Sequence, residues 1–193
     1  IPIPYKPSDK APVRIVMNPS TACAGLLINK IIKPTSKPNR IAKTEEVKPD
    51  AEGWLKTSTI EEVESLWNYR INEETNTVVL ESLKENNVKS DDIKIEIPRT
   101  VDGHNVALSN LNTATFQNAT HIRIAEGEEQ VKLLATDIHH GFLNNKNLKH
   151  VELKGLDVSG VTDMTMLFSG CDNLQVINLL DWDIQNDTIT TSM

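Results

Sequence analysis

Two adjacent histidines, His139 and His140, are the residues of this chain with the clearest potential for chemistry. Imidazole nitrogens bind zinc and related metals, and they act as general acids and bases near neutral pH. Adjacent side chains point in different directions on a helix or a strand, so a metal site here needs carboxylates from elsewhere in the chain. The sequence does not say which ones. We therefore interpret the pair as surface residues and predict no metal and no cofactor.

Short motifs of the common enzyme classes are missing from the sequence. It contains no Gly-x-Ser-x-Gly elbow, no phosphate-binding glycine loop and no His-Glu-x-x-His pair. Counting residues alone leaves a Ser/His/Asp nucleophile open, but no group of residues forms a recognisable active site. We expect a protein that is not an enzyme.

The two cysteines are too few for a disulfide framework. We expect Cys171 to be a small buried side chain rather than a reactive thiol. Cys23 lies in Ser-Thr-Ala-Cys-Ala-Gly, which is similar to a lipid-attachment site. It lacks the apolar stretch that precedes such a site, so we favour an unmodified cysteine.

These residues belong to a chain that repeats itself. Between residues 142 and 184, residues of the same kind recur at an offset of 26: Phe142 and Phe168, Leu148 and Leu174, Val151 and Ile177, Leu153 and Leu179, Asp157 and Asp183, Val158 and Ile184. A period in the twenties is typical of a stacked solenoid, in which each unit buries its apolar face against its neighbours. The repeat therefore predicts an elongated stack of coils.

Short alternating runs mark the strands of this stack. They cover residues 95–97, 122–124, 151–153 and 177–179, with apolar residues two apart around one polar residue. This is the period of a half-buried strand, and the nearly even spacing of the four runs matches the offset of the repeat. We predict an α/β solenoid with a right-handed, leucine-rich-repeat-like array of short parallel strands and short helical or irregular returns.

The outward side chains of these strands are the candidate binding site. In the predicted register, one column contains Glu96, Arg123, Glu152 and Asn178, and the next contains Lys94, His121, His150 and Val176. Neighbours in a column lie about 4.8 Å apart, so the first three residues could form an ion ladder. We take as candidate ligand-binding residues Glu96, Arg123, Glu152, Asn178, His121 and His150. Protonation of the two histidines near pH 6 would make this face more positive.

The C-terminal part of the sequence also resembles a known family. Residues 161–171 read Val-Thr-Asp-Met-Thr-Met-Leu-Phe-Ser-Gly-Cys, and Asn173-Leu174 and residues 180–183 (Leu-Asp-Trp-Asp) follow. This pattern is similar to the repeat of BspA-like leucine-rich surface proteins and mycoplasma-type surface lipoproteins. Residues 66–71 and 95–106 resemble the opening segments of the same family. Leu167 departs from the pattern, because a second Met is usual there, and Thr190 lies where the offset would place a Met.

The resemblance implies a secreted protein of the bacterial cell surface that serves in adhesion or protein binding. The implied partner is a host matrix protein, a host cell-surface protein or a wall polymer. A structural stalk that displays a distal domain, and the non-catalytic part of a surface-polymer hydrolase, are the alternatives. Met193 falls in mid-repeat, so we expect a fragment whose cell-wall or membrane anchor lies outside the sequence.

Composition divides the chain into three parts. Eight of the nine prolines fall at or before Pro49, so residues 1–55 are expected to be an extended lead-in with possible strands at 13–17 and 26–32. Residues 56–90 are expected to form an N-terminal cap. It consists of a helix at 59–66 that begins with a Ser58–Glu61 capping box, followed by a hairpin. Residues 91–193 hold the repeats.

Charge and hydropathy exclude two classes of partner. Residues 1–50 carry a net charge of +5 and the remainder carries −12. An acidic body argues against nucleic acid, because phosphate binding requires clustered positive charge. The basic segment could meet an anionic surface polymer, although lysines spaced among prolines are more often solubilising. No apolar run long enough to cross a bilayer is present, so no membrane span is predicted.

Overall fold

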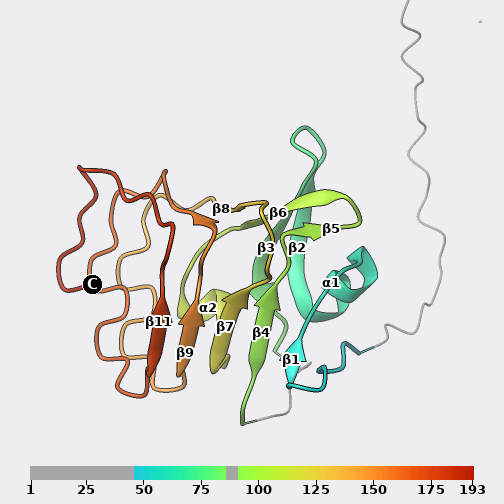
Figure 1. Ribbon diagram of the computed structural model, residues 1–193, viewed down its shortest axis with the longest axis horizontal. Helices are drawn as coiled ribbons and strands as arrows, with labels where there is room; N and C mark the ends of the chain where they lie inside the picture. Colours follow the sequence, from blue (N-terminus) through green and yellow to red (C-terminus); the bar gives the residue numbers. More distant parts are fainter. Residues whose placement is uncertain (1–45, 86–90) are drawn as a thin grey trace, which may run out of the picture. The chain divides into compact units, whose positions relative to one another are not determined.

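The computed structural model describes residues 46–85 and 91–193 (Figure 1). All of them belong to one compact unit, Ala42–Met193. The strands predicted at 13–17 and 26–32, and Cys23, lie outside the described residues and stay predictions.

The first face of the solenoid is a parallel sheet of five short strands, here called sheet A. In spatial order they are β1 (Trp54–Leu55), β4 (Lys94–Ile97), β7 (His121–Ile124), β9 (His150–Glu152) and β11 (Val176–Asn178). The last four lie side by side in Figure 1, and Lys94, His121, His150 and Val176 are successive register partners. The predicted strand positions and their spacing are therefore confirmed. β1 adds a strand that the repeat did not reveal.

A second sheet, sheet B, forms another face. Its order is β10 (Leu156–Asp157), β8 (Val131–Leu133), β6 (His104–Leu108), β3 (Thr77–Leu83) and β2 (Trp67–Asn72), and β5 (Thr100–Val101) pairs with β6. The first four of these strands run parallel, whereas β2 and β3 form the predicted antiparallel hairpin. Because β3 also pairs with β6, the hairpin is part of the solenoid wall.

The third side has almost no regular secondary structure, yet its backbone is well bonded. Amides of Ile138, His140, Phe142 and Asn144 donate to carbonyl oxygens of Asp163, Thr165, Leu167 and Ser169, at 2.8–2.9 Å. Every second amide of this segment therefore donates to the neighbouring coil, so the backbone is hydrogen-bonded between coils rather than within a helix. Within the described residues, helix is confined to α1 (Ile60–Leu66) and α2 (Thr113–Phe116). The protein is thus a β-solenoid with little helix, and its period lies in the twenties that stacked repeats commonly show.

The core fills the space inside the coils. Each central strand alternates buried and partly exposed residues, so Ile95, Ile97 and Ile122 point inward and are fully buried. An aromatic row runs through successive coils, with ring centroids 6.0, 6.1 and 5.6 Å apart, and consists of Trp67, Phe116, Phe142 and Phe168. Cys171 is buried as predicted, and its thiol donates to the carbonyl oxygen of Phe142 at 3.0 Å. Burial raises the pKa of this thiol.

The helix α1 begins one residue later than the sequence analysis assumed. The capping box is formed by Thr59 and Glu62, not by Ser58 and Glu61. The Thr59 hydroxyl accepts from the Glu62 amide, while Glu62 accepts from the amides of both Ser58 and Thr59. Ser58-x-x-Glu61 and Thr59-x-x-Glu62 both match the motif. The second one places Val63 and Leu66 against the core.

The corner that leads from sheet A to sheet B varies in length. The chain passes from Glu96 to Ala107 in one coil, from Arg123 to Lys132 in the next, and from Glu152 to Asp157 in the third, although these ends are register partners. The corner therefore shortens from coil to coil. The side chain of Arg99 spans these corners and donates to the carbonyl oxygens of Ala125 (2.6 Å), Glu129 and Lys154 (3.2 Å). One guanidinium thereby fastens three successive corners.

Candidate functional site on sheet A

The two predicted outward columns exist in the structure. Glu96, Arg123, Glu152 and Asn178 are successive register partners, and so are Lys94, His121, His150 and Val176. Their side chains lie on the outer face of sheet A, where all but Val176 are partly buried. Geometry thus brings the six candidate residues together on one surface, as the sequence analysis predicted.

Arg123 is the central residue of this face. Its Nε atom donates to Glu96 Oε2 at 2.7 Å, and a second guanidinium nitrogen lies 2.6 Å from the same oxygen. The guanidinium also stacks on Trp54, 3.8 Å from the ring centroid. Charge-assisted bonds on one side and an aromatic ring on the other hold Arg123 in one orientation.

The residues on either side of β1 close one end of the face. Lys56 lies 2.8 Å from Asp50 and 3.7 Å from Glu96. The hydrogen bond from Lys56, together with amide bonds from Trp54 and Glu52, lowers the pKa of Asp50 to about 2. Asp50 therefore stays ionised and anchors the turn that places Trp54 over Arg123.

A histidine cluster occupies the neighbouring column. The rings of His121 and His150 stack with centroids 5.6 Å apart, and Trp54 meets the edge of His121. Asp92 lies 3.4 Å from His121 Nδ1 and accepts from the Thr120 hydroxyl at 2.9 Å. Burial lowers the pKa of His121 despite the nearby carboxylate, whereas the Thr120 bond lowers the pKa of Asp92. Burial therefore favours the neutral form of the His121 imidazole, which suits its stacked position.

Only the first half of the predicted ion ladder forms. Glu96 and Arg123 pair, but Glu152 lies 3.2 Å from His150 in its own strand. The His150 Nε2 atom is buried without a hydrogen-bond partner within the described residues, so this contact has ion-pair distance but poor hydrogen-bond geometry. Asn178 accepts from the Leu180 amide at 3.1 Å and shapes a turn.

Four residues of this face were missed by the sequence analysis: Trp54, Lys56, Asp92 and Lys149. Trp54 and Lys56 come from the part of the chain where β1 meets β4, and there Trp54 is the register partner of Lys94. The sequence separation of Trp54 and Lys94 is much longer than the one between the other strands of sheet A. The repeat therefore could not predict that β1 joins this sheet. Asp92 and Lys149 lie close before strands, and they could have been found by extending the outward columns backward.

Sheet B has a concave outer surface of its own. A groove of about 740 Å³ lies between the β2–β3 hairpin and the loop at 128–130. Its lining contains both signs of charge, with Arg70 and Lys132 against Glu128 and Glu129. It has no aromatic side chain among its lining residues. We therefore regard sheet A as the stronger candidate.

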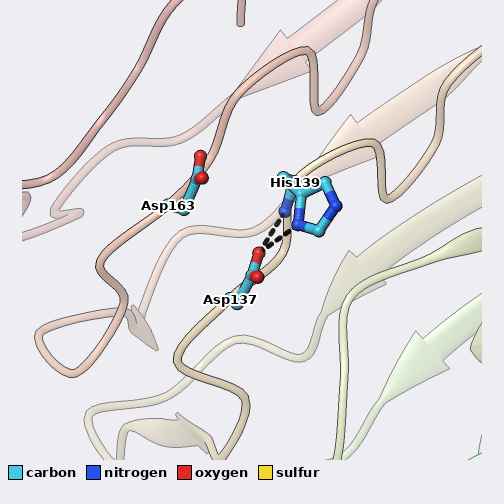
Figure 2. Close-up of side chains that lie close together, drawn as sticks. All are labelled: Asp137, His139 and Asp163. Carbon is cyan, nitrogen blue, oxygen red and sulfur yellow. Dashed lines mark hydrogen bonds and ion pairs between the residues drawn. The ribbon is translucent and has the colours of Figure 1, made fainter.

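The histidine pair of the sequence analysis lies on the third side of the coil. The structure supplies the carboxylates that the sequence could not place, because Asp137 and Asp163 are bridge partners beside His139 (Figure 2). Hydrogen bonds from the His139 amide and ring lower the pKa of Asp137, and that carboxylate raises the pKa of His139. Hydrogen bonds from Thr165 lower the pKa of Asp163. These contacts favour the ionised form of both carboxylates and the protonated form of His139.

Comparison with known proteins found no match: no protein-family model, no curated protein and no solved structure is significantly similar to this chain. Among the described residues, no helix has the length and apolar composition needed to cross a membrane.

Proposed function

We propose that this chain is a non-enzymatic protein-binding module of a bacterial surface protein, and that sheet A is its binding face. The proposal includes a right-handed array of BspA-like leucine-rich repeats, secretion, and adhesion to a host matrix protein, a host cell-surface protein or a wall polymer. The similarity of residues 161–183 to BspA-like repeats supports the family and the location. Met164, Leu167, Phe168 and Cys171 of that motif are buried, as repeat-defining residues should be.

The proposal that sheet A binds a protein rests on the fixed orientation of the Arg123 side chain. Trp and Arg dominate the energetics of protein interfaces, and binding is tighter when their side chains are ordered beforehand. Trp54 and Glu96 hold Arg123 in place from two strands of the same sheet. Extended faces of solenoids commonly bind partners in this way, because the stacked strands form a rigid surface.

The charge of the face favours a protein over a polyanion. It combines four cations, Lys56, Lys94, Arg123 and Lys149, with four carboxylates, Asp50, Asp92, Glu96 and Glu152. A balanced, mixed surface gives specificity by matching charges one by one, whereas a polyanion would need an excess of cations. The partner we propose therefore presents both signs of charge.

A structural stalk is the rival function, and one observation favours it. Most charges of sheet A already pair with each other, as Arg123 does with Glu96 and Lys56 with Asp50. Such pairs also occur on surfaces that bind nothing. The hydrolase alternative has weaker support, because the two acids that line the groove of sheet B, Glu128 and Glu129, are exposed neighbours in the sequence.

The test is a binding panel of host matrix proteins, host cell-surface proteins and bacterial wall polymers, probed with the whole chain, Ile1 to Met193. One variant combines Glu96→Ala, Arg123→Ala and Glu152→Ala on sheet A. A matched variant combines Arg70→Ala and Glu81→Ala, an exposed ion pair of sheet B with an Arg–Glu distance of 3.2 Å. Circular dichroism and thermal melting establish that both variants are folded.

Saturable binding that the sheet A variant loses and the sheet B variant keeps would support the proposal. Loss in the sheet B variant alone would move the site to the groove of sheet B. Binding to no member of the panel would favour the stalk.

A further inference from the structure

The cluster of Asp137, His139 and Asp163 has no part in the proposed binding face. It lies on the third side of the coil, where the chain returns between the two sheets. We propose that these three residues bind a divalent transition-metal ion of the Zn²⁺ type, which would join two adjacent coils.

The coil geometry positions the two carboxylates. Asp137 and Asp163 are partners in a parallel bridge, so their side chains leave the backbone on the same side, one strand spacing apart. The Ile138 amide donates to the Asp163 carbonyl oxygen at 2.9 Å, and the His140 amide donates to that of Thr165 at 2.8 Å. These bonds fix the separation of the two coils at the cluster. Figure 2 shows the two carboxylates and the imidazole on adjacent segments.

Each aspartate has one oxygen that local structure does not use. Asp137 Oδ1 accepts from the His139 amide at 3.0 Å, and Asp163 Oδ1 accepts from the Thr165 amide at 2.8 Å. The hydrogen bonds of the described residues leave Oδ2 of both carboxylates for another ligand. The turns and a metal ion therefore do not compete for the same atom.

The imidazole completes a set of three donors. One ligand atom from each residue lies within 4.8 Å of the other two. His139 Nδ1 is 2.5 Å from Asp137 Oδ1. Two donors on a tetrahedral Zn²⁺ lie about 3.4 Å apart, as bonds of about 2.1 Å require, so small rotations would bring His139 Nδ1 and Asp137 Oδ2 to one ion. The Asp137 and His139 side chains are half exposed, which leaves them free to make these rotations.

The donor types select the class of metal. Two carboxylate oxygens and one imidazole nitrogen suit Zn²⁺ and similar borderline ions, and two negative charges balance one dication. Ca²⁺ prefers six to eight oxygen ligands, which this cluster lacks. Three protein ligands leave further positions to water or to a group from outside. The bridge partner of Asp163 in the next coil is Ile189, whose side chain offers no ligand atom. That coil therefore adds no donor to the cluster.

The test is calorimetric titration of the metal-stripped whole chain with ZnCl₂, using the variants Asp137→Asn and Asp163→Asn. Asparagine keeps the Oδ1 acceptor that shapes each turn but removes the carboxylate charge. We expect each variant to bind Zn²⁺ at least about tenfold more weakly at this site, or to lose one equivalent of Zn²⁺. Zn²⁺ should also raise the melting temperature of the unmodified chain more than that of either variant.

Asp157→Asn is the matched control, because Asp157 caps a similar turn at Ser159 outside the cluster. It should bind Zn²⁺ as the unmodified chain does, which separates this site from weak binding at the sheet A histidines. Unchanged affinity and stoichiometry in Asp137→Asn and Asp163→Asn would overturn the proposal. So would failure of the unmodified chain to bind Zn²⁺ saturably, or tighter binding of Ca²⁺ than of Zn²⁺.

Discussion

The guanidinium of Arg123 lies 3.8 Å from the centre of the Trp54 ring, and each residue comes from a different strand of sheet A. This contact joins the strand β1, which the repeat does not predict, to the centre of the candidate binding face. The two residues should therefore be energetically coupled.

A double-mutant cycle with Trp54→Leu and Arg123→Gln measures this coupling. A cation over an indole ring in a partly buried site contributes about 1 kcal/mol, so the double variant should lose about that much less free energy of unfolding than the two single losses added together. Pairing Trp54→Leu with Lys132→Gln, in the other sheet, should give additive losses. Additivity in both cycles would contradict a stabilising contact.

Gly141 is a position where the coil tolerates no side chain. A Cβ atom there would lie 2.4 Å from the Leu111 carbonyl oxygen and 2.7 Å from Leu167 Cδ1. Gly141→Ala should cost about 3 kcal/mol of unfolding free energy in chemical denaturation, because backbone must move to relieve the clash. Gly160 has open space around it, so Gly160→Ala should change stability far less. Equal effects would mean that the coils are not packed as described.

The guanidinium of Arg99 is expected to stabilise several corners at once. A lysine at this position has a single ammonium group and cannot reach the carbonyl oxygens of Ala125, Glu129 and Lys154 together. Arg99→Lys should therefore lower the free energy of unfolding by about 2 kcal/mol. The exposed Arg70, with one ion pair to Glu81, provides the comparison, and Arg70→Lys should cost less than about 0.5 kcal/mol. A similar loss in both variants would show that Arg99 makes no special contribution.

His121 should make folding sensitive to mild acid. Because burial lowers its pKa below the ordinary value of 6.5, its contribution to stability is present above pH 6.5 and is lost as pH falls through the lowered pKa. Thermal melts on either side of pH 6.5 should therefore show a larger acid-induced loss in the unmodified chain than in His121→Gln. Parallel melting curves for the two proteins would refute the assignment to His121.

His139 provides a contrast of opposite sign. The pKa of His139 is raised by Asp137, so its contribution is present below pH 6.5 and is lost as pH rises through the raised pKa. In chelator-containing buffer, His139→Gln should therefore lose more stability on acidification than the unmodified chain. An equal loss in the two proteins would mean that the pair with Asp137 does not stabilise the fold.

The sequence predicted sheet A well because its strands repeat an inward apolar pair around one polar residue. Ile95 and Ile97 define their register as clearly as any pattern of this length can, and the outward columns follow from it. Sheet B was largely missed. β8 and β10 have three and two residues, too few for alternation to be seen.

The turns of the third side could not be predicted from the sequence, for a different reason. One row of its left-handed positions recurs at the offset of 26 but holds His140, Met166 and Ser192, with φ values of 58, 54 and 53°. Without glycine at these positions, the sequence carries no turn signal. The same offset, applied to Asp137, leads to Asp163. The carboxylates beside His139 were therefore within reach of the repeat argument, although the Trp54–Arg123 contact was not.

The corners that lead from sheet A to sheet B differ in length, which shows where the chain tolerates insertions and deletions. Connections of three different lengths join the same two register positions in successive coils, while the strands on either side stay aligned. Insertions and deletions at this corner therefore leave the stack intact, as they do in surface loops generally. The exposed residues 126–128 of the middle corner are accordingly the place to graft a foreign peptide, with sheet A beside them as a fixed platform.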